Sequence, residues 1–272
     1  MLHVRANDVS MVQEAGIRRI LLSEKDTQGL FRLETRRIYA HDEKEPYCDG
    51  PVTYCVIEGN SLFRYQSSGE SPQTILARVG DIVHLPVQVR YTVEVAECTI
   101  SSLLMLHVHA DDSQQVQHIK IGDGKSLAVF TDIGTFKIIG EENAQTYLLM
   151  EWRVPSSGGP ALHAQSTQET FYILQGTFTF RGLRAEETFI AGEGDVVHVP
   201  ARVVHSYKNS SNFPGKILVL FTPAGSTQQF FEDIGFPITG GSSSSHAILP
   251  DPTKIALILQ KYKDKVTIFP EP

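Results

Sequence analysis

The sequence Gly80-Asp81-Ile82-Val83-His84-Leu85-Pro86 occurs a second time, 114 residues later, as Gly194-Asp195-Val196-Val197-His198-Val199-Pro200. Upstream of it, Tyr54-Cys55-Val56-Ile57-Glu58-Gly59 returns after 117 residues as Phe171-Tyr172-Ile173-Leu174-Gln175-Gly176. The two blocks keep their order and nearly the same offset, which is far longer than the unit of a solenoid. The sequence therefore predicts a duplicated domain, with one copy in residues 1–112 and the other in residues 113–272.

Each copy is predicted to consist of short antiparallel strands. Apolar residues occupy every second position from Leu148 to Val154, as in a strand with one buried face. Further strands are expected at 171–174, 177–180, 187–190, 195–199 and 217–221, with glycines as turn residues between them. This order of elements predicts an all-β fold, a barrel or sandwich in each copy.

Helices are expected mainly near the C-terminus, where they would pack on the outside of the second copy. Ser226 with Gln229 is a candidate capping box for a helix that ends at Gly235. Asp251 and Pro252 supply a typical N-cap and first residue for another helix.

The composition narrows the range of partners. The 272 residues are 41% hydrophobic and 20% charged, which is typical of a globular chain, and the formal net charge of −7 comes without any basic run. We therefore expect neither nucleic acid nor membrane as a partner. The N-terminus lacks a secretory signal, and three cysteines without metal-binding spacing fit reduced thiols, so a cytoplasmic location is predicted.

Candidate metal ligands stand at two places in the second copy. The first block runs from Gly158 through His163, Gln165 and Glu169 to Gly176, and the second runs from Gly194 through Pro200 and His205 to Asn209. Residues two apart on a strand share a face, so His163 and Gln165 are expected to point to the same side. Two imidazoles and one carboxylate form the ligand set that suits non-haem Fe(II) with open coordination positions.

The spacing of these blocks resembles the two motifs of the cupin family, G-x5-H-x-H-x3/4-E-x6-G and G-x5-P-x-G-x2-H-x3-N. The sequence departs from them at Gln165, where a second histidine is usual, at Arg202, where a glycine is usual, and in the short spacing from Gly158 to His163. The stretch from Phe221 to Gly235 is also similar to the tail of quercetinase-like cupins. The resemblance implies a bicupin, two tandem double-stranded β-helix (jelly-roll) barrels.

The same resemblance implies a metal site in the second barrel. Its ligands would be His163, Glu169 and His205, and Gln165 would either complete the ligand set or tune it as a weaker or water-bridged group. The ion would be one divalent transition metal, preferably Fe(II), with Ni, Mn, Cu or Zn as alternatives. Glu169 would also be the catalytic residue that takes a proton from the substrate.

The first copy serves as an internal comparison. His163, Gln165, Glu169 and His205 correspond there to Pro46, Cys48, Val52 and Tyr91. Because none of these except the lone thiol is a ligand type, the N-terminal barrel is expected to hold no metal. His198 has a counterpart in His84 of this barrel, which favours a structural role for both.

The resemblance implies a metal-dependent oxygenase, a ring-cleaving dioxygenase that acts with O2 on a flavonol-like or other aromatic or enolic small molecule. Phe171, Ile173, Val197 and Phe221 are candidates for the walls of its pocket. Two alternatives stay open: a metal-dependent isomerase or lyase, and a non-catalytic, seed-storage-like bicupin that binds a small ligand. Packing between the copies through apolar sheet faces is expected, with extension to a homodimer as an option.

Overall fold

The computed structural model describes residues 1–6, 11–13, 17–42, 51–109, 115–238 and 251–270. The chain divides into two compact units, Asp8–Asp123 and a discontinuous unit made of Met1–Asn7 and Gly124–Pro272. Both units consist almost entirely of antiparallel strands, so the predicted all-β fold is confirmed.

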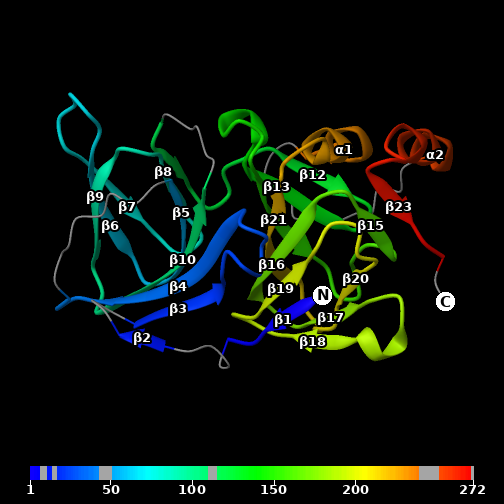
Figure 1. Cartoon of the computed structure of the whole chain (residues 1–272), viewed down its shortest axis with the longest axis horizontal. Helices are drawn as coiled ribbons and strands as arrows, with labels where there is room; N and C mark the ends of the chain where they lie inside the picture. The colour runs from blue at the N-terminus through cyan, green and yellow to red at the C-terminus, as the bar shows by residue number, and fades with distance from the viewer. Residues whose placement is uncertain (7–10, 14–16, 43–50, 110–114, 239–250, 271–272) are drawn as a thin grey trace. The chain divides into compact units, whose positions relative to one another are not determined.

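The unit Asp8–Asp123 contains two sheets, ordered β11-β8-β5-β10-β4-β3-β2 and β7-β6-β9 (Figure 1). Their apolar side chains form one core that includes Val52, Tyr54, Phe63 and Tyr91. The strands are β2 (Met11–Gln13), β3 (Ile17–Leu22), β4 (Phe31–Tyr39), β5 (Val52–Glu58), β6 (Ser61–Gln66), β7 (Gln73–Ala77), β8 (Ile82–Leu85), β9 (Arg90–Val95), β10 (Ile100–Val108) and β11 (Gln117–Ile119).

The other unit repeats this plan with sheets ordered β1-β19-β16-β21-β14-β13-β12-β22 and β18-β17-β20, and adds the pair β15-β23. Its elements are β1 (Leu2–Val4), β12 (Ser126–Val129), β13 (Asp132–Ile138), η1 (Gly140–Glu142), β14 (Leu148–Val154), β15 (His163–Gln165), β16 (Gln168–Gln175), β17 (Phe178–Arg181), η2 (Ala185–Glu187), β18 (Phe189–Ala191), β19 (Val196–Val199), β20 (Ser206–Asn209), β21 (Gly215–Thr222), α1 (Thr227–Ile234), β22 (Phe236–Pro237), α2 (Pro252–Lys261) and β23 (Val266–Ile268).

Strand β14 shows why these sequences form the barrel wall. Leu148, Met150, Trp152 and Val154 are all buried in one apolar cluster, as the alternation of side chains along a strand requires. The neighbouring strands β13 and β21 pair with β14 on its two sides, so this wall is continuous.

The repeated Gly-Asp pair anchors an additional edge strand in each unit. Asp81 accepts hydrogen bonds from His118 Nε2 (2.9 Å) and from the amide of Ile121 (2.8 Å), and β11 pairs with β8. Asp195 makes the same contacts with His3 Nε2 (3.1 Å) and the amide of Ala6 (2.8 Å), and β1 pairs with β19.

Because of these edge strands, the observed division of the chain differs from the boundary expected between residues 112 and 113. Strand β11 lies beyond residue 112 but belongs to the first unit, and β1 lies at the start of the chain but belongs to the second. The reason is that each sheet edge satisfies its backbone groups with a segment that is distant from it in the sequence.

The two C-terminal helices form where the sequence predicts them. Asp251 accepts a hydrogen bond from the amide of Thr253 with Pro252 at the first position, as expected. Helix α1 starts directly after Ser226 and ends before Gly235, as predicted. The predicted capping box is wrong, because the side chain of Ser226 makes no capping hydrogen bond. Neither helix, nor any other in the described ranges, is long and apolar enough to cross a bilayer.

Candidate metal centre

Three segments of the second unit bring His163, Glu169 and His205 together. His163 begins β15, Glu169 lies near the start of β16, and His205 immediately precedes β20. The backbones of His163 and His205 are joined by two mutual hydrogen bonds of 2.9 and 2.8 Å. This bridge places the two imidazole rings with their centroids 4.4 Å apart.

The histidines are held in one tautomer by their own segments. Nδ1 of His163 lies 2.9 Å from the carbonyl oxygen of Ala161, and Nδ1 of His205 lies 3.0 Å from that of Val203. Because a carbonyl can only accept, each Nδ1 carries the hydrogen and each Nε2 presents a lone pair. Both Nε2 atoms face Glu169 Oε2, at 3.9 Å from His163 and 2.8 Å from His205.

These atoms fit a divalent metal ion. The ligand atoms of the three side chains all lie within 4.8 Å of one another, a spacing compatible with ligand distances of about 2.0–2.2 Å to a shared ion after small adjustments. Glu169 Oε2 and His205 Nε2 are buried without a well-formed hydrogen bond despite their short separation. Buried polar atoms left in this state normally have a partner such as an ion.

The electrostatics of the three groups depend on burial and on their mutual contacts. Burial, together with the nearby His205, lowers the pKa of His163 to about 4, so this imidazole is neutral at neutral pH. Burial opposes the charged forms of Glu169 and His205, but their mutual attraction outweighs it: the pKa of the carboxyl is lowered and that of the imidazole is raised. A metal ion would compete with the proton on His205 for the same lone pair.

Gln165 lies beside the three groups, as its position on β15 predicts. Its side chain is buried, lines the same cavity as His163, and donates a hydrogen bond that helps lower the pKa of Glu169. The structure thus places Gln165 as a neighbour of the carboxylate; its service as a metal ligand stays a prediction.

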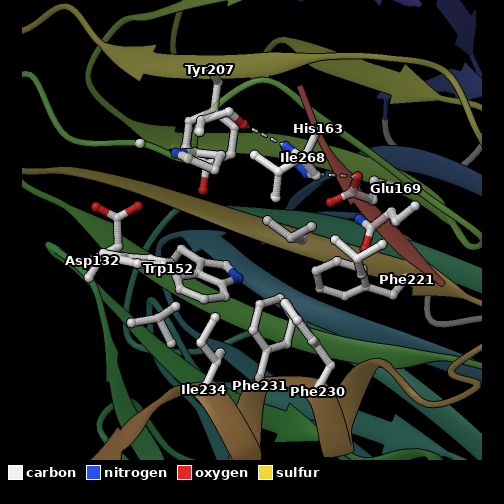
Figure 2. A pocket seen from close by; sticks show the side chains of 18 of the residues that line it. Asp132, Trp152, His163, Glu169, Tyr207, Phe221, Phe230, Phe231, Ile234 and Ile268 are labelled. Atoms are coloured by element: carbon white, nitrogen blue, oxygen red, sulfur yellow. Dashed lines mark hydrogen bonds and ion pairs between the residues drawn. The ribbon is translucent and has the colours of Figure 1, made fainter. Parts of the chain in front are cut away.

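His163 and Glu169 line one side of a cavity of about 240 Å³ in the second barrel (Figure 2), whereas His205 is buried next to them and does not line it. No lysine or arginine of the described chain lines it. Its polar lining consists of Asp132, His163, Gln165, Glu169 and Tyr207. The remaining lining comes mainly from the barrel wall, both helices and β23. It consists of Val129, Phe130, Trp152, Gly159, Pro160, Ala161, Phe171, Val219, Phe221, Phe230, Phe231, Ile234, Ile255, Leu259, Val266 and Ile268.

Several further expectations can be compared with this geometry. Phe171 and Phe221 line the cavity, whereas Ile173 and Val197 are buried in the core and do not. The helices do not simply cover the outside of the barrel: α1 and α2 supply part of the cavity wall. His198 bonds Thr170 (2.9 Å), and His84 bonds Thr53 at the same distance.

The positions of the first unit that correspond to the ligands are described only in part. Val52 and Tyr91 are buried in its core. Pro46 and Cys48 lie outside the described residues. That the first barrel holds no metal stays a prediction.

Among the cavity residues that the sequence did not identify are Asp132, Trp152 and Tyr207. Tyr207 could have been found, because it follows His205 by two positions and shares its face. The alternation of side chains predicts that Trp152 lies on the apolar face of β14. It does not indicate that this part of the face borders a cavity and not a packed core. No signal in the sequence singles out Asp132.

Comparisons with known proteins agree with this architecture. Residues 150–221 match the family model described as the cupin domain. No curated protein matches the chain. The chain has the bicupin fold, two tandem cupin barrels, of which the second carries the candidate metal centre.

Among solved structures, the oxalate decarboxylase of Bacillus subtilis is similar, with 12% identity, a TM-score of 0.66, and coverage of 99% of this chain and 89% of that chain. A formate complex of the Lactobacillus farciminis oxalate decarboxylase has 13% identity, a TM-score of 0.65, and coverage of 82% and 86%. The 11S allergen of Cocos nucifera has 10% identity, a TM-score of 0.62, and coverage of 82% and 89%. At these identities the likeness establishes the fold; the quercetinase-like part of the resemblance stays a prediction.

Proposed function

We propose that the chain is a metal-dependent enzyme that binds an apolar, ring-containing small molecule and acts on a hydroxyl or enol group of it. The observation that carries this proposal is the cavity itself: two members of the candidate ligand set, His163 and Glu169, line a chamber whose walls are mainly aromatic and aliphatic side chains. Such a chamber selects apolar ligands, and its few polar groups fix their orientation.

The charge of the lining argues against a small dianion such as oxalate. Two carboxylates, Asp132 and Glu169, line the cavity, and no described lysine or arginine does. Apart from the proposed metal ion, a carboxylate substrate that leaves water would find no cationic side chain to pair with. The substrate is therefore proposed to be neutral and apolar, unlike that of the oxalate decarboxylases whose fold the chain shares.

His163, Glu169 and His205 would hold the ion, and a bound divalent ion supplies a Lewis acid that favours ionisation of a substrate hydroxyl. Glu169 is ionised at neutral pH because the nearby His205 lowers its pKa, so it can accept that proton. Gln165 orients Glu169 by its hydrogen bond. The aromatic side chains of the wall exclude water from the reacting group.

The leading reaction class is a lyase or isomerase, in which a proton is moved and no O2 is consumed. The structures most relevant to this choice belong to decarboxylases, which cleave a carbon–carbon bond, and one of them describes Mn(II) centres in the Bacillus subtilis enzyme. Manganese is accordingly placed beside Fe(II) as a proposed ion.

A second candidate is the ring-cleaving dioxygenase. The aromatic lining favours it, because a flavonol-like substrate would pack against Phe171, Phe221 and Trp152. A set of three protein ligands also leaves coordination positions for a substrate oxygen and O2.

Oxygen uptake separates the two candidates. The chain is reconstituted with Fe(II) or Mn(II) and offered three compounds, which are 2-tetralone (a neutral ketone that enolises), quercetin and oxalate, while O2 and product are followed. Enolisation or cleavage without O2 uptake supports the lyase or isomerase, and uptake of one O2 per quercetin supports the dioxygenase. Turnover of oxalate in preference to both apolar compounds would contradict the proposed substrate class.

A further inference from the structure

The cavity has a second group of polar side chains on the side opposite Glu169. Asp132, the first residue of β13, and Tyr207, on β20, lie on the opposite side of the chamber from Glu169 (Figure 2). Asp132 is 5% exposed and Tyr207 is 8% exposed. We call these two residues the Asp132 end of the cavity.

Asp132 is a carboxylate in an unfavourable place. It accepts hydrogen bonds from the hydroxyl of Thr131 (2.9 Å) and from the backbone amide of Gly159, but no lysine or arginine of the described chain shares the cavity with it. Burial raises the pKa of Asp132 to about 6 in spite of these bonds. A buried carboxylate without a cation costs stability, and residues retained at such a cost often have a function.

Tyr207 presents an unused hydroxyl beside it. The ring packs edge-on against Phe171 and Phe178, with centroids 5.5 and 6.1 Å apart. The hydroxyl has no hydrogen-bond partner among the described residues, although buried tyrosine hydroxyls usually find one.

Together these two groups match one chemical function. A hydroxyl group can donate one hydrogen bond and accept another. Its hydrogen would go to Asp132, and its oxygen would accept the hydrogen of Tyr207. A methyl or halogen substituent in the same place would leave both protein groups unsatisfied, which is costly in a buried site.

We propose that Asp132 and Tyr207 bind a hydroxyl group of the substrate on the side of the cavity opposite Glu169. The substrate class is then an apolar ring system with two polar ends, one at the ligand residues and one at Asp132. That the bound molecule is a substrate rests on the proposed function, whereas recognition of the hydroxyl group does not depend on it.

Trp152 allows a direct test. It is the single tryptophan of the chain and lines the cavity between the two ends. Two probes of nearly equal shape, 4-iodophenol and 4-iodotoluene, are titrated into the full-length chain without added metal, and quenching of Trp152 fluorescence by iodine gives both dissociation constants. We expect the phenol to bind about tenfold tighter or better, as for a hydrogen bond to a charged group.

Variants assign this preference to its end of the cavity. In Asp132→Asn the preference is expected to fall to about twofold or less, because the hydroxyl loses its charged acceptor. Asp195→Asn is the matched control: Asp195 accepts backbone amides of the same barrel, as Asp132 does, but does not line the cavity. It should keep the full preference. A folded Asp132→Asn chain with an unchanged preference would overturn the proposal.

Tyr207→Phe is a second variant that tests the same preference if Asp132→Asn fails to fold. It removes one hydroxyl, preserves the packed ring and is expected to lower the preference severalfold; an unchanged preference in this variant would also overturn the proposal. The outcomes are independent of metal and turnover. A chain that binds no metal but prefers the phenol would contradict the proposed metal-dependent enzyme and support the hydroxyl site at Asp132. A chain that binds metal but shows no preference for the phenol would contradict the hydroxyl site and leave the proposed enzyme standing.

Discussion

The imidazole rings of His163 and His205 are oriented by the same local hydrogen bond. Each donates its Nδ1 hydrogen to the carbonyl oxygen two residues earlier in the chain, that of Ala161 or Val203. The orientation of the imidazoles therefore comes from the backbone of their own segments and not from a third side chain. This arrangement prepares both Nε2 atoms for a ligand before one is bound.

Gln165 is the residue at which the site departs from the family motif, so its role can be tested by substitution. Gln165→Ala is expected to weaken metal retention by about tenfold, because it removes the hydrogen bond to Glu169 but no strong donor atom. Gln165→His should tighten it, since an imidazole is a stronger ligand than an amide oxygen. Metal content after dialysis at fixed pH measures both effects. Complete loss of metal in Gln165→Ala would instead make Gln165 a full ligand.

Asp132 gives a prediction about stability and pH. Its pKa is about 6 in the folded chain against an ordinary value of 3.8, so the folded state holds the extra proton between these values. The stability that this proton supplies is complete below pH 3.8 and is lost as the pH rises through 6, amounting to about 3 kcal/mol.

Replacing Asp132 by asparagine removes this loss. The free energy of unfolding of Asp132→Asn relative to the wild type should therefore rise by up to about 3 kcal/mol between pH 4 and pH 7.5. The weakened bonds to Thr131 and Gly159 lower the stability of the variant at both pH values. Urea unfolding midpoints of both chains at the two pH values measure the difference. An equal stability difference at pH 4 and pH 7.5 would show that the carboxylate does not have the raised pKa.

At the scale of single residues, the sequence was sufficient where regular geometry applied. The i, i+2 relation on a strand predicts that His163 and Gln165 share a face, and the structure shows both lining the cavity. It could not identify Asp132, because its importance comes from its position across the chamber, which depends on how β13 lies opposite segments far away in the sequence.

Among the elements, the short strand β15 that carries His163 and Gln165 depends on the C-terminal segment. It pairs with β23, where Ile268 lies opposite His163 and Val266 opposite Gln165. The amides of Ser166 and Phe269 add bonds across the same pair, to the carbonyls of Lys265 and Leu162 (both 2.8 Å). A sequence pattern cannot show this pairing, since three-residue strands carry too little periodicity.

Truncation of the chain after Lys263 tests the importance of this pairing. Loss of β23 leaves β15 without its partner and opens the cavity at Val266 and Ile268, so metal retention should fall about tenfold or more while the strands of the barrel stay folded. Metal content and the circular dichroism spectrum measure the two effects. Unchanged metal retention would show that β15 is held by its bridge to His205 alone.

The strand β1 provides the contrasting truncation. Deletion of residues 2–6 removes the pairing with β19 and the contacts of His3 and Ala6 with Asp195, which should lower the unfolding midpoint of the second barrel. It should leave the number of metal ions per chain unchanged, because β1 does not line the cavity. Loss of metal in proportion to the loss of β1 would contradict this separation of roles.

For the whole molecule, the two barrels share a scaffold and differ in the candidate site. The Gly-Asp anchors and the Thr–His pairs recur in both, which explains why these residues dominate the repeat in the sequence. Conversely, the ligand positions differ, with Val52 and Tyr91 in the core of the first unit. The repeat therefore predicted a duplicated domain, and the resemblance to the cupin motifs implied the bicupin fold. The edge strands that cross the expected boundary could not be identified from the repeat, because they are too short to align.

His163, Glu169 and His205 are proposed to hold one divalent metal ion. The direct measurement is elemental analysis of the full chain, purified without chelator and reconstituted without oxygen with Fe(II), Mn(II), Ni(II), Cu(II) or Zn(II), beside His163→Ala, Glu169→Ala and His205→Ala. We predict about one ion per wild-type chain and essentially none in each variant, because each strong donor is needed in a three-ligand set. A wild type that retains none of these metals, or a Glu169→Ala chain that retains a full equivalent, would show that these three residues do not form the metal site.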